Sequence, residues 1–101
     1  MKQEDAIEPL KEAWREEGVL EKIRYGEFDE LKAEKLLELI RLIEVAPGDK
    51  LAPDLVKYMW TMPAFVLGFV DDVTENSEER EKYLWFHTQL HSGVRRILGG
   101  P

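Results

Sequence analysis

The strongest hydrophobic pattern along the chain lies in residues 28–45, where leucine and isoleucine recur at helical spacing. At about 100° per residue, Glu30, Glu34, Glu38 and Arg41 fall together on the opposite face of a helix. The apolar arc is wide. Residues 28–45 therefore predict a central helix that other elements contact on more than one side.

A second long helix is predicted over residues 77–98. Asn76 or Ser77 is the expected N-cap, because a short polar side chain there can accept a hydrogen bond from the first turn. Arg95 and Arg96 stand at the other end, where positive charge stabilises the helix dipole.

Prolines and glycines divide the rest of the chain into short segments. A first helix is expected over residues 5–17, with Asp5 as N-cap and Gly18 as a left-handed stop, and a short helical piece follows at 19–25. Residues 64–73 are expected to continue a helix that starts at Pro53.

Pro63 interrupts that segment, because proline lacks the backbone N–H and clashes with the preceding turn. Met62 is expected to be extended, since a residue before proline avoids the helical region. The sequence thus predicts a two-part helix with a joint at 61–63. A cavity beneath this joint is one candidate site for a small apolar ligand.

Together these segments predict an all-α fold. We expect a single compact bundle of four to five helices, with one domain over residues 1–101, because 101 residues are enough for one domain and too few for two.

Charge and composition exclude several classes of function. Fourteen Lys+Arg against 21 Asp+Glu give a net charge of −7, which argues against nucleic acid or an anionic membrane surface as partner. The chain has no cysteine, so disulfides and thiolate chemistry are excluded. No run of apolar residues is long enough to span a bilayer, and no targeting segment is visible, so we expect a cytoplasmic protein.

The two histidines are His87 and His91, four residues apart on the predicted last helix. This spacing places both imidazoles on one face, where they can share a metal ion, with Glu79 as a third ligand or a carboxylate such as Asp71 or Asp72. The favoured alternative is that both line the core or a subunit interface, each hydrogen-bonded to a backbone carbonyl or a carboxylate. The spacing alone does not match a zinc-protease motif, and no cofactor other than a metal ion is indicated.

Large apolar residues are crowded on the same helix. Tyr83, Trp85 and Phe86 cannot all be buried by a helix that packs on one side only, and Trp85 falls roughly opposite the Tyr83 and His87 stripe, beside Arg96. Either a second layer covers Trp85 or it anchors an interface. Tyr83, Trp85, Phe86 and Arg96 are therefore the candidate interaction residues, while Trp14 and Trp60 are expected in the core.

No phosphate-binding loop, hydrolase elbow or activated nucleophile is present in the sequence, so catalysis has little support. The favoured interpretation is a non-enzymatic, homodimeric protein-interaction module of the adaptor, inhibitor or assembly-factor type. Its partner is a second copy or another protein, and the acidic clusters favour a basic one. The alternative is a small metal-binding helical protein that uses His87 and His91.

Overall fold

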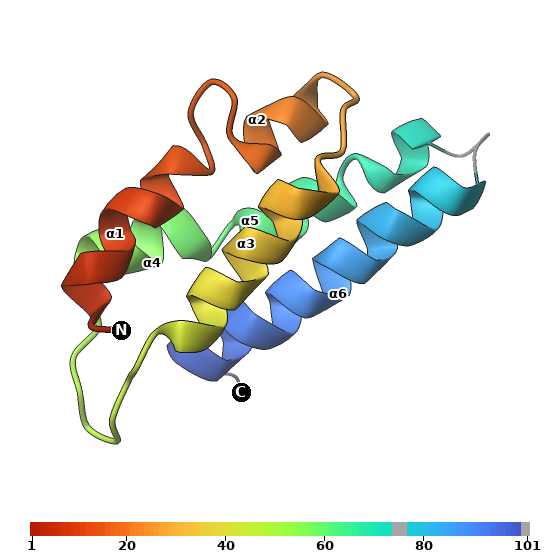
Figure 1. Ribbon diagram of the computed structural model, residues 1–101. Coiled ribbons are helices and arrows are strands. Elements are labelled where there is room, and N and C mark those ends of the chain that lie inside the picture. The colour runs from red at the N-terminus through yellow and green to blue at the C-terminus, as the bar shows by residue number, and fades with distance from the viewer. Residues whose placement is uncertain (74–76, 100–101) are drawn as a thin grey trace.

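Figure 1 shows the computed structural model, which describes residues 1–73 and 77–99 of the chain. All regular structure in these residues is helical, which confirms the predicted all-α fold. The elements in chain order are α1 (Gln3–Glu12), α2 (Val19–Arg24), α3 (Glu30–Leu42), α4 (Pro53–Met59), α5 (Met62–Leu67), the 3-10 helix η1 (Val70–Val73) and α6 (Ser77–Leu98).

The two longest helices, α3 and α6, lie side by side and run in the same direction (Figure 1). Lys82 near the start of α6 pairs with Glu30 at the start of α3, at 3.5 Å. Near their ends, the Arg96 guanidinium reaches the backbone of α3. The remaining helices form the other layer, in which α1 packs against α4 and α5 packs along α6.

One hydrophobic cluster joins all six α-helices. Its largest fully buried side chains share the inward faces of their helices: Leu10, Leu20, Ile23, Ile40, Ile43, Leu55, Met59, Met62, Val66, Tyr83, Phe86 and Leu90. Among the described residues no polar or charged residue is buried. The core is therefore entirely apolar apart from the phenol of Tyr83.

Helix α3 begins at a side-chain cap. The Asp29 carboxylate accepts a hydrogen bond from the Lys32 N–H at 3.1 Å and another from the Lys22 ammonium at 3.2 Å. These bonds favour the ionised acid and lower the pKa of Asp29, the Lys32 N–H contributing most. The predicted central helix over 28–45 is correct in place but begins and ends inside those bounds.

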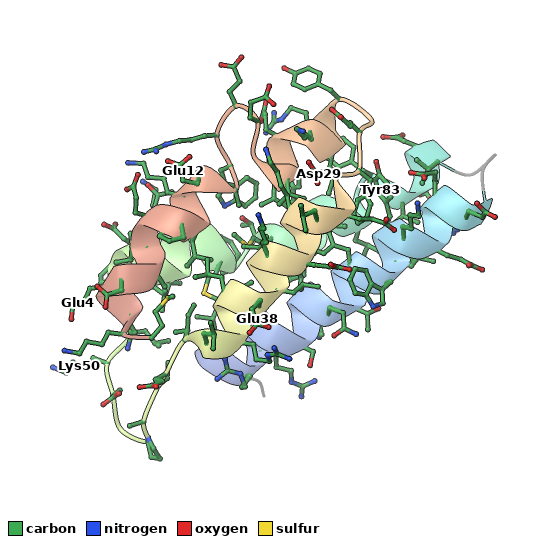
Figure 2. All side chains as sticks on the ribbon, in the orientation of Figure 1. Glu4, Glu12, Asp29, Glu38, Lys50 and Tyr83 are labelled. Carbon is green, nitrogen blue, oxygen red and sulfur yellow. The ribbon has the colours of Figure 1, made fainter. Side chains whose placement is uncertain are left out.

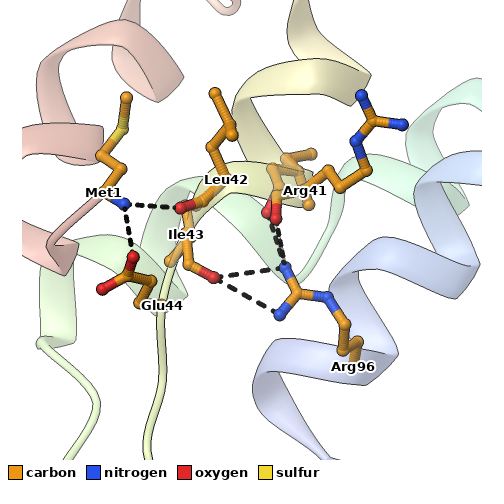
Figure 3. Close-up of polar contacts among 7 residues, drawn as sticks. Met1, Arg41, Leu42, Ile43, Glu44 and Arg96 are labelled. Atoms are coloured by element: carbon orange, nitrogen blue, oxygen red, sulfur yellow. Dashed lines mark hydrogen bonds and ion pairs between the residues drawn. The ribbon is translucent and has the colours of Figure 1, made fainter.

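The last carbonyls of α3 have no partner within the helix, and side chains from elsewhere supply the donors. Arg96 of α6 donates to the carbonyls of Ile40 at 2.8 Å and of Arg41 and Ile43 at 3.3 Å (Figure 3). The amino group of Met1 donates to the Leu42 carbonyl at 2.7 Å. Arg96 thus caps one helix from another.

The first helix differs from the prediction at both ends. Helix α1 begins at Gln3, two residues before the predicted Asp5 cap, because the Gln3 side chain bonds the 50–52 segment: its amide donates to the Lys50 carbonyl and its oxygen accepts from the Ala52 N–H. Pro9 lies inside the helix, which ends three residues later at Glu12.

Gly18 was expected to be the left-handed stop, and this is wrong. Gly18 has φ −72°, while Glu17 takes the positive value of 67°. Glycine is needed at position 18 for a different reason: a Cβ there would lie 2.3 Å from the Glu12 carbonyl oxygen and 2.5 Å from that of Ala13. The chain therefore turns back directly onto the end of α1.

The joint predicted at 61–63 is present between α4 and α5. Its geometry differs from the expectation, because Met62 is helical and Pro63 occupies the first turn of α5, where its missing N–H costs little. Helix α5 ends at Leu67, and η1 replaces the rest of the predicted 64–73 helix.

Two of the tryptophans differ in burial. Trp14 packs against the core, and its indole N–H donates to the Tyr58 carbonyl at 2.8 Å, as expected for a core residue. Trp60, also expected in the core, is 62% exposed. Trp60 directly follows the last residue of α4 and lies on the outer side of the joint, because Met59 and Met62 take the two buried positions.

Within the described residues no helix is both long and apolar enough to cross a membrane. The expected loop at 74–77, the Asn76 or Ser77 cap and the frayed tail at 99–101 lie wholly or in part outside the described residues.

Candidate functional site

Trp85 lies in a groove between α3 and α6. Its side chain is 43% exposed, and the groove has a volume of about 450 Å³. The lining comes from both helices, with Glu34, Leu37, Glu38, Ile40 and Arg41 on α3 and with Trp85, Gln89, Ser92, Gly93 and Arg96 on α6. The exposed aromatic face therefore sits in a concave surface.

The groove exists because α3 and α6 approach closely at one end. A Cβ on Gly93 would lie 2.8 Å from Ile40 Cγ2, so only glycine permits this separation. A glycine inside the predicted last helix can indicate close packing of another helix. The sequence-based prediction did not use Gly93 in this way.

Charge is distributed unevenly along this groove. Where α3 and α6 begin, a second hollow of about 430 Å³ adjoins it, lined by Trp85 and by four glutamates against one lysine: Glu30, Glu34, Glu78, Glu81 and Lys82. Lys82 pairs with Glu30 and with Glu79, and these carboxylates raise its pKa, Glu30 most. At the opposite end, Arg41 pairs with Glu38 (labelled in Figure 2) and Arg96 caps α3.

Of the four predicted interaction residues, Trp85 and Arg96 reach solvent in the groove, whereas Tyr83 and Phe86 are buried. Tyr83 (Figure 2) and Phe86 are 1% and 0% exposed, because Phe28 packs on both rings from the segment before α3. Burial raises the pKa of the Tyr83 phenol. Arg96 lines the groove, but its guanidinium is engaged by the α3 carbonyls. Tyr83 and Phe86 are therefore core residues and not surface contacts. The role of Arg96 as an interaction residue stays a prediction.

His87 and His91 do lie on one face of α6, as predicted, with their ring centroids 6.1 Å apart. His87 is half-buried, and its Nδ1 lies 2.9 Å from the Pro63 carbonyl oxygen, as in the alternative interpretation. His91 is exposed. The two imidazoles therefore differ in their freedom to move.

Glu79 does not join the histidines. It stands eight residues before His87, or about 12 Å along the helix, and pairs with Lys82 at 3.4 Å. Asp71 pairs with Arg80 at 3.8 Å. In the described part of the chain, no group of three or more metal-ligating side chains of this type converges. Metal binding by His87 and His91 stays a prediction.

The histidines open onto a second groove, between α5 and α6, which has a volume of about 640 Å³. Its walls are mostly apolar, and they include Trp60, Pro63, Ala64, Leu67, Val94 and Leu98. Trp60, Ala64 and Leu67 recur at helical spacing along the outer side of the Pro63 joint. This spacing was a signal for a second apolar face, missed because Trp60 was assigned to the core. The cavity predicted beneath the joint is open to solvent on this face.

Comparison of the chain with known protein families, curated proteins and solved structures finds no match.

Proposed function

We propose that this protein is a non-enzymatic protein-interaction module that binds a basic helical segment of another protein in the groove around Trp85. The observation that carries the proposal is a half-exposed tryptophan in a concave surface whose adjoining end holds four glutamates against one lysine. Tryptophan is the side chain most often found at the centre of binding hot spots.

The shape of the groove supports a helix as the occupant. Two helices that run side by side leave a channel parallel to both, into which an amphipathic helix can place its apolar face. Helix α3, at 13 residues, is about 20 Å long, so a partner helix of three to four turns matches its length. Trp85 lines both hollows of this channel, at the point where they adjoin.

The charge of the protein supports a basic partner. A net charge of −7 attracts a positively charged segment from a distance. At close range, Glu34 and Glu81 offer carboxylates to lysine or arginine, and a cation can also lie over the Trp85 ring. A second copy of this acidic chain is disfavoured on this face, because its glutamates would meet one another.

A non-enzymatic role is supported by the distribution of ionisable groups. Catalytic sites concentrate titratable groups whose pKa values are shifted by burial. Among the described residues, all Asp, Glu, Lys, Arg and His side chains reach solvent at least in part. The grooves are thus surfaces suited to recognition.

The test measures binding of a fluorescein-labelled model helix of about 18 residues, composed of lysine, leucine and alanine, by fluorescence anisotropy. We expect a Kd on the order of micromolar at low salt, weakening at an ionic strength of about 1 M, where surface charges are screened. Replacing each lysine of the peptide by glutamate should abolish binding.

Two tryptophan variants form a matched pair for this test. Trp85→Ala should weaken binding at least about tenfold, because it removes the central anchor. Trp60→Ala removes an exposed tryptophan from the other groove and should leave the Kd unchanged. Equal losses in the two variants, or equal affinity for the lysine and glutamate peptides, would contradict the proposal.

A further inference from the structure

His87 is held in an orientation that suits a metal ligand. Its Nδ1 lies 2.9 Å from the Pro63 carbonyl oxygen, which can only accept a hydrogen bond, so Nδ1 carries the proton. Nε2 is then the nitrogen with the free lone pair. Metal-binding histidines commonly donate their second ring N–H to a backbone carbonyl in this way, which fixes the tautomer and the ring.

His91 is placed to share an ion with His87. The spacing of four residues puts both rings on one face of α6, and their centroids are 6.1 Å apart. Two imidazoles bound to one tetrahedral zinc at about 2.0 Å have centroids roughly 5 Å apart. The two rings must therefore approach each other by about 1 Å. His91 can make this movement, because its exposed ring is free to change rotamer.

The described residues offer these two nitrogens no further ligand. Apart from the histidines, the described lining of the α5–α6 groove holds one charged side chain, Arg95, and no carboxylate. As noted above, the described residues contain no converging group of three metal ligands. A four-coordinate ion bound by these two histidines therefore takes its other ligands from outside the described residues.

We propose that His87 and His91 are half of a zinc site, which His87 and His91 of a second copy complete across a two-fold axis. Four imidazole nitrogens satisfy the tetrahedral preference of Zn²⁺. Two-fold symmetry supplies the second pair from the same face, as in most homodimers.

The surroundings of the histidines favour a second copy as the occupant. Trp60 and Leu67 flank the groove and are 62% and 48% exposed. The molecule has a net charge of −7, so two copies repel each other. The described lining of the α5–α6 groove has no carboxylate, so pairing through this face brings fewer negative charges together than pairing through the Trp85 groove would. The apolar area alone is small against the roughly 800 Å² per partner of a typical interface. We therefore expect pairing to depend on the metal.

The experiment is the mass in solution, by light scattering after size exclusion, of the chain without a histidine tag. Zinc chloride should convert the 11.8 kDa monomer into a species of twice that mass, with one zinc per two chains, and EDTA should reverse it. Because no peptide is used, the result is independent of binding in the Trp85 groove.

Variants on α6 separate ligation from folding. His91→Gln changes an exposed side chain and should remain monomeric with zinc, with helix content and melting temperature unchanged. Gln89→Ala, on the Trp85 side, should dimerise like the parent. Arg95→Gln removes a positive charge from the groove and should lower the zinc concentration needed for pairing. A monomer at saturating zinc, or a dimer that persists in EDTA, would overturn the proposal.

Discussion

The cap that Arg96 forms on α3 leads to a quantitative prediction. Its guanidinium donates to the Ile40 carbonyl at 2.8 Å and, more weakly, to those of Arg41 and Ile43 at 3.3 Å. A hydrogen bond from a charged group contributes about 1.5–3 kcal/mol. Arg96 is exposed, so the lower half of this range applies. Positive charge at the C-terminal end of a helix adds a few tenths of a kcal/mol. Arg96→Met should therefore lower the free energy of unfolding by about 2 kcal/mol.

The assay is urea unfolding followed by circular dichroism. A loss of about 2 kcal/mol moves the midpoint by about 1 M, for an m-value near 2 kcal/mol/M. The melting temperature should fall by about 8–16 °C. Arg96→Lys should recover part of the loss, because an ammonium can reach one carbonyl but lacks the planar fork of donors.

The neighbouring arginine provides the control. Arg95 lines the other groove, and among the described residues its side chain forms no hydrogen bond or ion pair. Arg95→Met should change the unfolding free energy by less than about 0.5 kcal/mol. If Arg96→Met and Arg95→Met unfold at the same urea concentration, Arg96 does not stabilise α3, and the assignment of Arg96 as a cap is refuted.

Three further substitutions test the fold. Phe86 is fully buried, so Phe86→Ala should lower the free energy of unfolding, measured in urea, by about 3–5 kcal/mol. A loss below about 1.5 kcal/mol would contradict its place in the core. Asp29→Asn keeps an N-cap side chain but cannot ionise. The pKa of Asp29 is lowered in the folded protein, so its stabilisation is present above about pH 4 and lost as the pH falls through the lowered value. The stability difference between parent and Asp29→Asn should shrink between pH 6 and pH 3, and a constant difference would refute stabilisation by the ionised Asp29 carboxylate. Gly18→Ala places a Cβ 2.3 Å from the Glu12 carbonyl oxygen and should lower the melting temperature by several degrees, while an unchanged melt would exclude the close approach.

The sequence was sufficient to predict the helices whose signals are local. Periodicity located α3, and the run from residue 77 to 98 has the observed bounds of α6. Pro63 predicted the break between α4 and α5. In each case the residues that determine the feature lie within the element or next to it in the chain.

Features that depend on contacts between distant residues were not predictable. Gln3 starts α1 early because its side chain bonds residues 50–52, and Arg96 caps a helix more than fifty residues away. The sequence could not show which helix would cover each side of Tyr83. The interaction site was predicted as four residues, of which Tyr83 and Phe86 are buried and Trp85 and Arg96 line a groove.

The most direct test of the proposed function uses the indole N–H signals of the three tryptophans in a ¹⁵N-labelled sample. Trp14 reports on the core, Trp60 on the α5–α6 groove and Trp85 on the α3–α6 groove. Titration with the lysine-rich helix should shift the Trp85 signal and leave those of Trp14 and Trp60 in place. A shift of the Trp60 signal instead, or no shift of any indole signal at saturating peptide, would contradict binding of a basic helix around Trp85.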